Sequence, residues 1–252
     1  GLNVIPKPVE YKDMKINRGS VTTFSQYSVV SENRVFPLEK NTPMDVSALL
    51  GCAVPTGMGM IFNNAKVKKN TTVLVIGCGG IGINAIHAAK VAKAKVIIGI
   101  DINDNKKKSA IKFGATHFFN FKDKDLLSKI NIICKKVDYS IDTVGIKKTM
   151  EFAYNISDNK SGYTILCGVP NPLSLKISIN PFPLYYGKKI TGTAGGETNP
   201  DRDLKKYENS YKNNIIDLKQ MITKVFSLND INKAISALRQ GNCIRVLIDM
   251  RL

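Results

Sequence analysis

Short apolar runs alternate with amphipathic stretches through the middle of the chain. Runs such as Val73-Leu74-Val75-Ile76 are apolar at every position, which is typical of parallel strands buried on both faces. Between the runs, apolar residues recur at helical spacing. The pattern predicts strands at residues 73–76, 96–100, 117–121, 137–142 and 163–166. It predicts helices that begin at residue 83, end at residue 113, and cover residues 126–133 and 149–154.

Each step from one strand to the next takes roughly 20 to 25 residues, the rhythm of a doubly wound α/β sheet. The flanks of the chain are less regular. They predict strands at residues 24–30 and 244–248, and helices at 47–49, 58–65 and 231–238. The expected N-caps of the first and last of these helices are the polar residues before them, Thr42 or Asp45 and Asn229 or Asp230.

A glycine-rich loop, Gly77-Cys78-Gly79-Gly80-Ile81-Gly82, links the first central strand to its helix. A lone G-x-G-x-x-G is weak evidence, but here the loop follows a buried strand and opens a helix. Its three motif glycines permit a tight turn, close approach to a pyrophosphate and close packing of helix on strand. The amino end of the helix adds free N–H groups and a partial positive charge. We therefore predict that the loop binds a dinucleotide in a Rossmann fold.

Asp101 ends the second central strand, 24 residues after Gly77. A carboxylate there would accept hydrogen bonds from the adenosine ribose hydroxyls and repel a 2′-phosphate. The position predicts NAD as the cofactor, while the lysines at residues 106–108 leave NADP open. The alternative without a cofactor is an ordinary turn with a solvent-facing aspartate.

Several motifs together point to one known family. They are Thr23-Phe24-Ser25-Gln26-Tyr27, Leu50-Gly51-Cys52-Ala53-Val54-Pro55-Thr56-Gly57, the glycine loop, Ile100-Asp101-Ile102-Asn103, Gly168-Val169-Pro170 and the segment from Leu238 to Arg245. The chain resembles the zinc-dependent medium-chain alcohol dehydrogenases, in the alcohol and S-(hydroxymethyl)glutathione dehydrogenase branch. The resemblance implies a Rossmann NAD-binding domain at residues 54–194. It also implies that residues 1–53 and 195–252 are parts of a β-rich, GroES-like catalytic domain.

The resemblance also implies roles for single residues. Cys52 would supply a thiolate to a catalytic zinc, although a buried structural cysteine is the commoner fate of this residue type. Thr56 would lie near the nicotinamide, Lys106 would reach the adenosine ribose and Arg245 the pyrophosphate. The nicotinamide end would be contacted by Ile81, Cys167, Gly168 and Val169.

The chain departs from the family pattern at its start. A catalytic zinc needs three protein ligands and an open position. The family's other ligands, its four-cysteine zinc site and its proton relay lie upstream of this segment. We therefore expect a fragment, beginning at Gly1 rather than at a methionine, that lacks most of the N-terminal catalytic domain and is inactive alone. Its catalytic residues are unknown, and we expect no functional role for His87 or His117.

The resemblance implies an NAD-dependent oxidoreductase that transfers hydride between an alcohol or aldehyde and nicotinamide, with zinc as Lewis acid. A zinc-free medium-chain quinone or enone reductase and a non-catalytic NAD-binding module remain open. A third alternative, nucleic-acid binding, rests on the formal net charge of +17. Lysines outnumber arginines roughly five to one and are spread along the chain, so we expect no nucleic-acid partner.

Cellular context follows from composition. The five cysteines are far apart and form no C-x-x-C pair, which favours a reducing cytoplasm over disulfide pairing. No apolar run approaches the ~18 residues of a membrane helix, so no membrane association is expected. The resemblance implies a homodimer or homotetramer, paired along a sheet edge at residues 189–193. The sequence does not identify the substrate.

Overall fold

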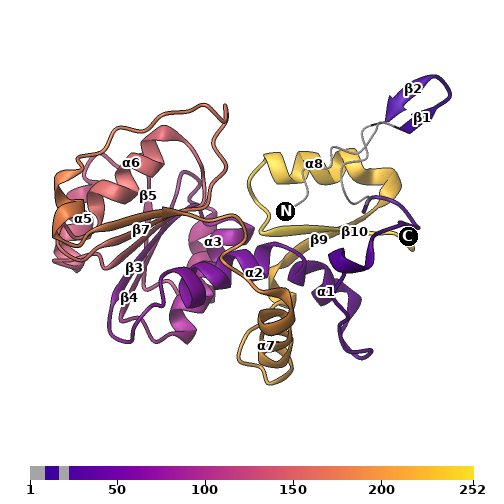
Figure 1. Cartoon of the computed structure of the whole chain (residues 1–252), viewed down its shortest axis with the longest axis horizontal. Helices are drawn as coiled ribbons and strands as arrows, with labels where there is room; N and C mark the ends of the chain where they lie inside the picture. Colours follow the sequence, from indigo (N-terminus) through magenta and orange to yellow (C-terminus); the bar gives the residue numbers. More distant parts are fainter. Residues whose placement is uncertain (1–8, 17–22) are drawn as a thin grey trace.

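The computed structural model of the chain describes residues 9–16 and 23–252, which form two bodies side by side (Figure 1). The larger body is built on a six-stranded parallel sheet of order β5-β4-β3-β6-β7-β8. Its strands are β3 (Thr72–Ile76), β4 (Val96–Asp101), β5 (His117–Asn120), β6 (Tyr139–Asp142), β7 (Tyr163–Leu166) and β8 (Lys189–Gly192). The chain reverses its direction of travel across the sheet between β3 and β6, as in a Rossmann fold. The predicted fold class is confirmed.

Apolar side chains of the central strand alternate between the two faces of the sheet. Val73 and Val75 belong to one buried cluster, and Leu74 and Ile76 belong to another. The first cluster includes residues of α2 (Ala53–Gly59), its π-helical continuation η2 (Met60–Asn64), α3 (Gly80–Val91) and α4 (Lys106–Phe113). The second includes residues of α5 (Leu126–Ile133) and α6 (Lys147–Ile156). Helices therefore cover both faces, which explains why the central runs are apolar at every position.

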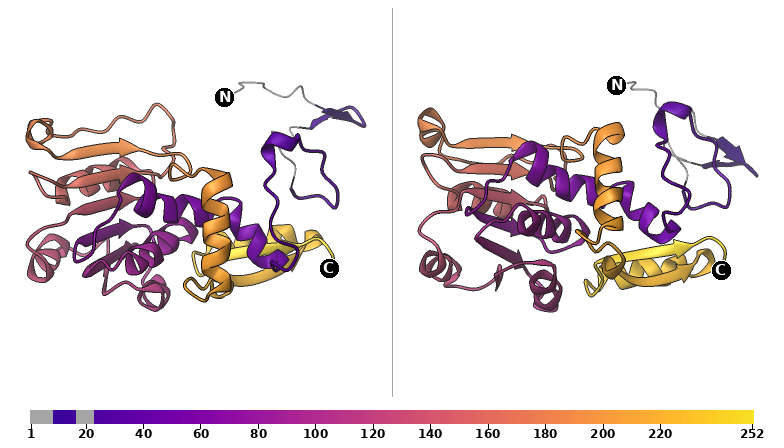
Figure 2. Two further views of the ribbon diagram at one scale, coloured as in Figure 1. Left: turned by 60° about the horizontal axis from the view of Figure 1, so that its bottom comes forward. Right: turned by 90° about the horizontal axis from the view of Figure 1, so that it is seen from below.

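The smaller body brings together elements from both ends of the described chain (Figures 1 and 2). They are the hairpin β1 (Val9–Tyr11) and β2 (Met14–Ile16), η1 (Glu32–Arg34), α1 (Met44–Leu50), η4 (Lys219–Met221), β9 (Ile222–Ser227), η5 (Leu228–Asp230), α8 (Ile231–Arg239) and β10 (Arg245–Asp249). Strands β9 and β10 pair in parallel as a separate two-stranded sheet. Helix α7 (Pro200–Lys212) lies between the two bodies (Figure 2), and η3 (Phe182–Tyr186) precedes β8.

The predicted central strands and helices are confirmed to within a few residues, but two predictions in the flanks are wrong. Residues 24–30 form no strand, and Tyr27 and Val29 are 92% and 101% exposed, so their alternation has no buried face. The N-cap of α1 is Pro43. Thr42 instead donates its hydroxyl hydrogen bond to Glu208 of α7, and Asp45 accepts from the Val46 N–H at 2.8 Å. Tertiary packing therefore decided what Thr42 binds, whereas the bond of Asp45 is local.

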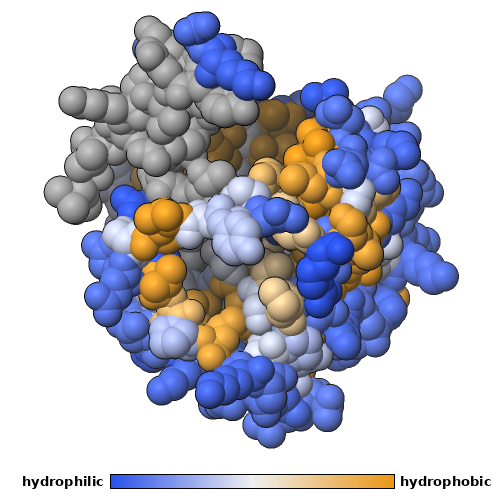
Figure 3. Space-filling model, turned by 90° about the vertical axis from the view of Figure 1, so that its right-hand side faces the viewer, coloured by the Kyte–Doolittle hydropathy of each residue, from blue (hydrophilic) through white to orange (hydrophobic). Residues whose placement is uncertain are grey.

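Within the described residues no single helix is long and apolar enough to span a membrane. One bent pair, Met44–Leu50 with Ala53–Asn64, has the length and composition together, with a bend of 49°. This pair contributes much of the first buried cluster. The right-hand face of the molecule in the view of Figure 1 carries apolar side chains among polar ones (Figure 3). Among the residues of the smaller body, Met44 is 72% and Leu238 50% exposed. The described residues therefore leave part of this face uncovered.

Candidate functional site

The glycine loop turns sharply at the carboxyl end of β3. Gly77 has a φ of +89°, which favours glycine, and its N–H donates to the Ile100 carbonyl of the neighbouring strand at 2.7 Å. A Cβ on Gly82 would lie 1.7 Å from the Gly77 carbonyl oxygen. Neither position tolerates a side chain in this conformation. The predicted roles of these two glycines in the turn and in the packing of α3 on β3 agree with this geometry.

The amino end of α3 faces open space. Its N-cap is Gly79, and no side chain caps the N–H groups of the first turn. A Cβ on Gly79 would meet no atom of the protein within 4 Å. Uncapped N–H groups and the helix dipole favour an anion at this place. The open space in front of Gly79 gives that anion room to approach the backbone.

Asp101 lies at the carboxyl end of β4, directly beside the loop. One carboxylate oxygen accepts from the Cys78 N–H at 2.7 Å and the other from the Asn103 N–H at 3.0 Å. Each oxygen keeps lone-pair capacity for a further donor. Cys78 points inward, where burial raises the pKa of its thiol, so its part in the loop is its backbone N–H. Asp101 thus supports the loop and remains able to accept hydrogen bonds from a ligand.

A segment from the smaller body completes this end of the sheet. The Arg245 side chain lies over the start of α3, since a Cβ on Gly80 would be 2.6 Å from its Cδ. The Arg245 Nε is buried without a hydrogen-bond partner among the described residues. This orphaned donor and the positive charge both suit an anion in front of α3.

Three contacts tie this segment to the turn that follows β4. The buried Lys106 amine donates to the Cys243 carbonyl at 2.6 Å. The Asn103 amide donates to the Gly241 carbonyl at 3.3 Å, and the Asn105 amide donates to Asn242 at 3.1 Å. The Lys106 amine is therefore engaged with backbone in this structure, and its contact with a ribose stays a prediction.

Cys167, Gly168 and Val169 follow β7 at the same edge of the sheet. The N–H groups of Cys167 and Gly168 donate to the Asp142 carbonyl at 2.8 and 3.1 Å. All three residues line a cavity of about 380 Å³ that extends to Gly192 and Thr193. Val169 is 75% exposed, so its side chain is free to contact a ligand.

Asp142 was not predicted as a site residue. It ends β6, is fully buried, and accepts from the Gly145 N–H at 2.9 Å with one carboxylate oxygen. Its other carboxylate oxygen has no partner among the described residues. Burial raises the pKa of Asp142, against the hydrogen bonds from Thr149, Gly145 and Val144. Asp142 ends β6 as Asp101 ends β4. This acidic residue at the end of a strand was the sequence signal that could have identified Asp142.

Cys52 and Thr56 lie at the start of α2, which packs on the glycine loop, since a Cβ on Gly57 would be 2.5 Å from the Ile81 carbonyl oxygen. Both line a cavity of about 710 Å³ between the two bodies, together with Ala194 and Gly195. Cys52 is exposed, whereas Thr56 is buried in α2. Burial, followed by the nearby Asp142 carboxylate and the Cys52 side chain, raises the pKa of the Cys167 thiol to about 11. No three His, Cys, Asp or Glu residues within the described chain are placed to hold a metal ion.

The two histidines have structural surroundings. His87 is buried in α3, with Nδ1 3.2 Å from the Phe113 carbonyl, and its Nε2 has no partner among the described residues. His117 lies 2.9 Å from the Thr116 hydroxyl at the amino end of β5, away from the carboxyl edge of the sheet.

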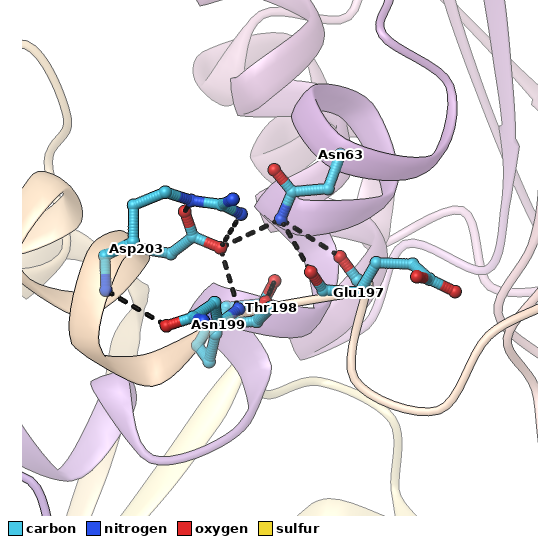
Figure 4. A network of polar contacts seen from close by, with 8 residues as sticks. Asn63, Glu197, Thr198, Asn199 and Asp203 are labelled. Carbon is cyan, nitrogen blue, oxygen red and sulfur yellow. Dashed lines mark hydrogen bonds and ion pairs between the residues drawn. The ribbon is translucent and has the colours of Figure 1, made fainter.

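A polar network fixes α7 against the helix that leads into the Rossmann body (Figure 4). The Asn63 amide of η2 donates to the carbonyls of Gly196 and Glu197 and to Asp203 at 3.3, 3.2 and 3.0 Å. Asp203 also accepts from the Asn199 N–H at 2.9 Å and pairs with Arg202. These bonds hold the segment that lines the Cys52 cavity.

The known proteins to which this chain is similar are dehydrogenases. A family model described as zinc-binding dehydrogenase matches residues 80–212. The S-(hydroxymethyl)glutathione dehydrogenase of Paracoccus denitrificans is 36% identical over 235 residues, covering 90% of this chain and 62% of that protein. The class-3 alcohol dehydrogenase of Zea mays is 35% identical over 234 residues, covering 92% of this chain and 61% of that protein.

A solved structure of similar shape is the benzyl alcohol dehydrogenase from Acinetobacter calcoaceticus. It superimposes with a TM-score of 0.85 at 25% identity, covering 91% of this chain and 64% of that one. The chain thus spans about 62% of the length of its curated relatives.

Proposed function

This chain belongs to the zinc-binding dehydrogenase family, and on that premise we propose that it forms the cofactor-binding part of an NAD(H)-dependent alcohol oxidoreductase. The relatives' names describe dehydrogenases of alcohols and of S-(hydroxymethyl)glutathione. An alcohol or aldehyde is accordingly the proposed substrate class.

The observation that carries the proposal is the convergence of anion-binding and ribose-binding groups at one edge of the sheet. The open, uncapped start of α3 suits a pyrophosphate, and Arg245 adds a positive charge above it. Asp101 stands beside them with acceptor capacity for ribose hydroxyls. These residues come from separate segments of the chain, and one dinucleotide would use all of them.

The chain's own residues would bind and orient the cofactor. The loop N–H groups and Arg245 would hold the pyrophosphate, Asp101 the adenosine ribose, and the backbone of residues 167–169 the nicotinamide end. When bound, the nicotinamide supplies the hydride acceptor or donor. Asp142 would position the backbone that contacts the nicotinamide end, because it accepts hydrogen bonds from the N–H groups of Gly145, Cys167 and Gly168.

The described residues do not fit a catalytic zinc by themselves. Cys52 is the single ligand that the family resemblance assigns here, and no three candidate ligand side chains gather around it. A catalytic zinc needs three protein ligands. We therefore assign no catalytic step to zinc in this chain. The domain division at residues 53 and 194, the assembly as a homodimer or homotetramer and the cytoplasmic location remain predictions.

The test is a fluorescence titration of the purified chain with NADH and with NADPH. We expect tighter binding of NADH, because the Asp101 carboxylate would repel a 2′-phosphate. Asp101→Asn removes a charged acceptor worth about 1.5–3 kcal/mol, so NADH should bind about 10- to 100-fold more weakly. Asp104→Asn, a change at an exposed carboxylate three residues on, is the matched control. Tighter binding of NADPH by the unmodified chain would refute the NAD assignment.

A further inference from the structure

A third cavity lies at the opposite edge of the sheet, at the amino ends of β6, β7 and β8. Its volume is about 720 Å³. It is lined by residues of η2 and the loop after it, by the loop between α6 and β7, by β8 and by Glu197. The dinucleotide site described above lies at the carboxyl ends of the same sheet. The two sites are therefore separate.

Two tyrosines and a lysine form one row across the floor of this cavity. Tyr139 pairs with Tyr163 in the register of β6 and β7, and Tyr163 pairs with Lys189 in the register of β7 and β8. Residues paired in this way point to the same face of a sheet. All three line the cavity, and both tyrosines are only partly buried. Two aromatic side chains from adjacent strands thus face a space large enough for a ligand ring.

Four lysines from three separate segments surround these tyrosines. They are Lys66, Lys68, Lys160 and Lys189. None of them forms an ion pair with any described residue, whereas several other lysines of the chain do. Glu197 is the one acidic side chain in the lining, so the lining carries four positive charges against one negative. Unpaired lysines that converge on a cavity favour a ligand with several negative charges.

We propose that this cavity is a second nucleotide site, which binds a nucleoside polyphosphate through its phosphates and its aromatic base. The four lysines take the phosphate chain, and the two tyrosines contact the base. A ligand with only one of these features leaves the other unused. The inference does not depend on the function proposed for the dinucleotide site.

Edge pairing of β8 in a dimer is compatible with this site. Such pairing uses the outward N–H and C=O groups of the strand. Lys189 and Thr191 project from the face of the sheet into the cavity instead.

The test is isothermal titration calorimetry of the purified chain with ATP and with tripolyphosphate, in the presence of saturating NADH. We expect one ATP per chain that NADH does not displace, and at least tenfold weaker binding of tripolyphosphate. Equal affinities would refute the contribution of the base. Loss of ATP binding on adding NADH would place ATP in the dinucleotide site and overturn the proposal.

Variants locate the binding. Lys66→Gln, Lys160→Gln and Lys189→Gln combined should weaken ATP binding at least tenfold. The control removes three exposed lysines elsewhere, Lys122, Lys124 and Lys176, and should change ATP affinity less than twofold. Equal losses in both variants would show a non-specific charge effect and refute the site. If the triple variant melts at a lower temperature, the single change Lys160→Gln, in an exposed loop, replaces it in the test. Unchanged ATP affinity of this single variant would count against the proposal.

Discussion

Replacing Gly79 by alanine should separate cofactor binding from folding. Gly79 has a φ of −81°, which any residue adopts, and its added Cβ would meet no protein atom within 4 Å. As the N-cap of α3 the change should cost at most about 1 kcal/mol. In a chain of this size that lowers the melting temperature by no more than about 4 °C. The methyl group would, however, occupy the space in front of the uncapped helix N–H groups.

The magnitude of the binding loss follows from the bonds that the methyl group blocks. A hydrogen bond from a backbone N–H to a charged phosphate contributes about 1.5–3 kcal/mol. Loss of one such bond weakens NADH binding about 10- to 100-fold. We therefore expect Gly79→Ala to melt within about 4 °C of the unmodified chain and to bind NADH at least tenfold more weakly. Thermal melts and fluorescence titration on the same preparation measure both.

Two other glycines supply the controls. A Cβ on Gly51, which has a φ of −72°, would meet only the Ala48 carbonyl at 3.9 Å, so Gly51→Ala should change neither property. Gly82→Ala would place its Cβ 1.7 Å from the Gly77 carbonyl, so it should lower both the melting temperature and NADH affinity. If Gly79→Ala binds NADH as tightly as the unmodified chain, the pyrophosphate does not approach this loop and the reasoning is wrong.

Three further predictions concern pH, metal and assembly. Burial lowers the pKa of His87 from 6.5. Below pH 6.5 the folded chain therefore binds fewer protons than the unfolded chain. The free energy of unfolding should then fall by up to about 1.4 kcal/mol for each pH unit. Urea titrations between pH 7 and pH 5 should show a flatter dependence for His87→Gln; an unchanged slope contradicts this. Elemental analysis of the purified 252-residue chain should find no stoichiometric zinc, and an absorbance assay should find no alcohol oxidation. If the chain instead holds one zinc ion, and Cys52→Ser removes it, a ligand set exists that we have not identified. Sedimentation should show a dimer, which Ile190→Pro converts to a monomer. The N–H groups of Lys189 and Thr193 donate inward to the carbonyls of Gly162 and Leu166, so the N–H of Ile190, between them, faces outward. A monomer at tens of micromolar before mutation contradicts the dimer.

The sheet and its glycine loop could be predicted because their signals are local. Each central strand is apolar at consecutive positions, and the loop has its strand and helix beside it in sequence. Helix α7 was missed because its buried residues, Asp203, Tyr207 and Glu208, are mostly polar. The pair Asn199 and Pro200, an N-cap followed by proline in the first turn, was the available signal.

Contacts between distant residues could not be predicted from local patterns. The apparent strand at residues 24–30 has alternation but no described partner, and alternation alone does not bury a face. The Thr42 hydroxyl donates a hydrogen bond to Glu208, 166 positions later, and does not cap the helix that follows Thr42. The place of Arg245 above α3 came from the family resemblance, since nothing in its neighbours along the chain indicates that it meets Gly80.

The position of Arg245 has a further consequence for the relation between the two bodies. Arg245 begins β10 in the smaller body, yet it lies over the first turn of α3 in the larger one. Its segment is held there by the bonds from Lys106 and Asn103, at the turn after β4 that also carries Asp101. A dinucleotide that contacts both Arg245 and the loop would bridge the bodies. Because a ligand that binds only the assembled state stabilises that state, part of the cofactor's binding free energy would hold the smaller body against the sheet.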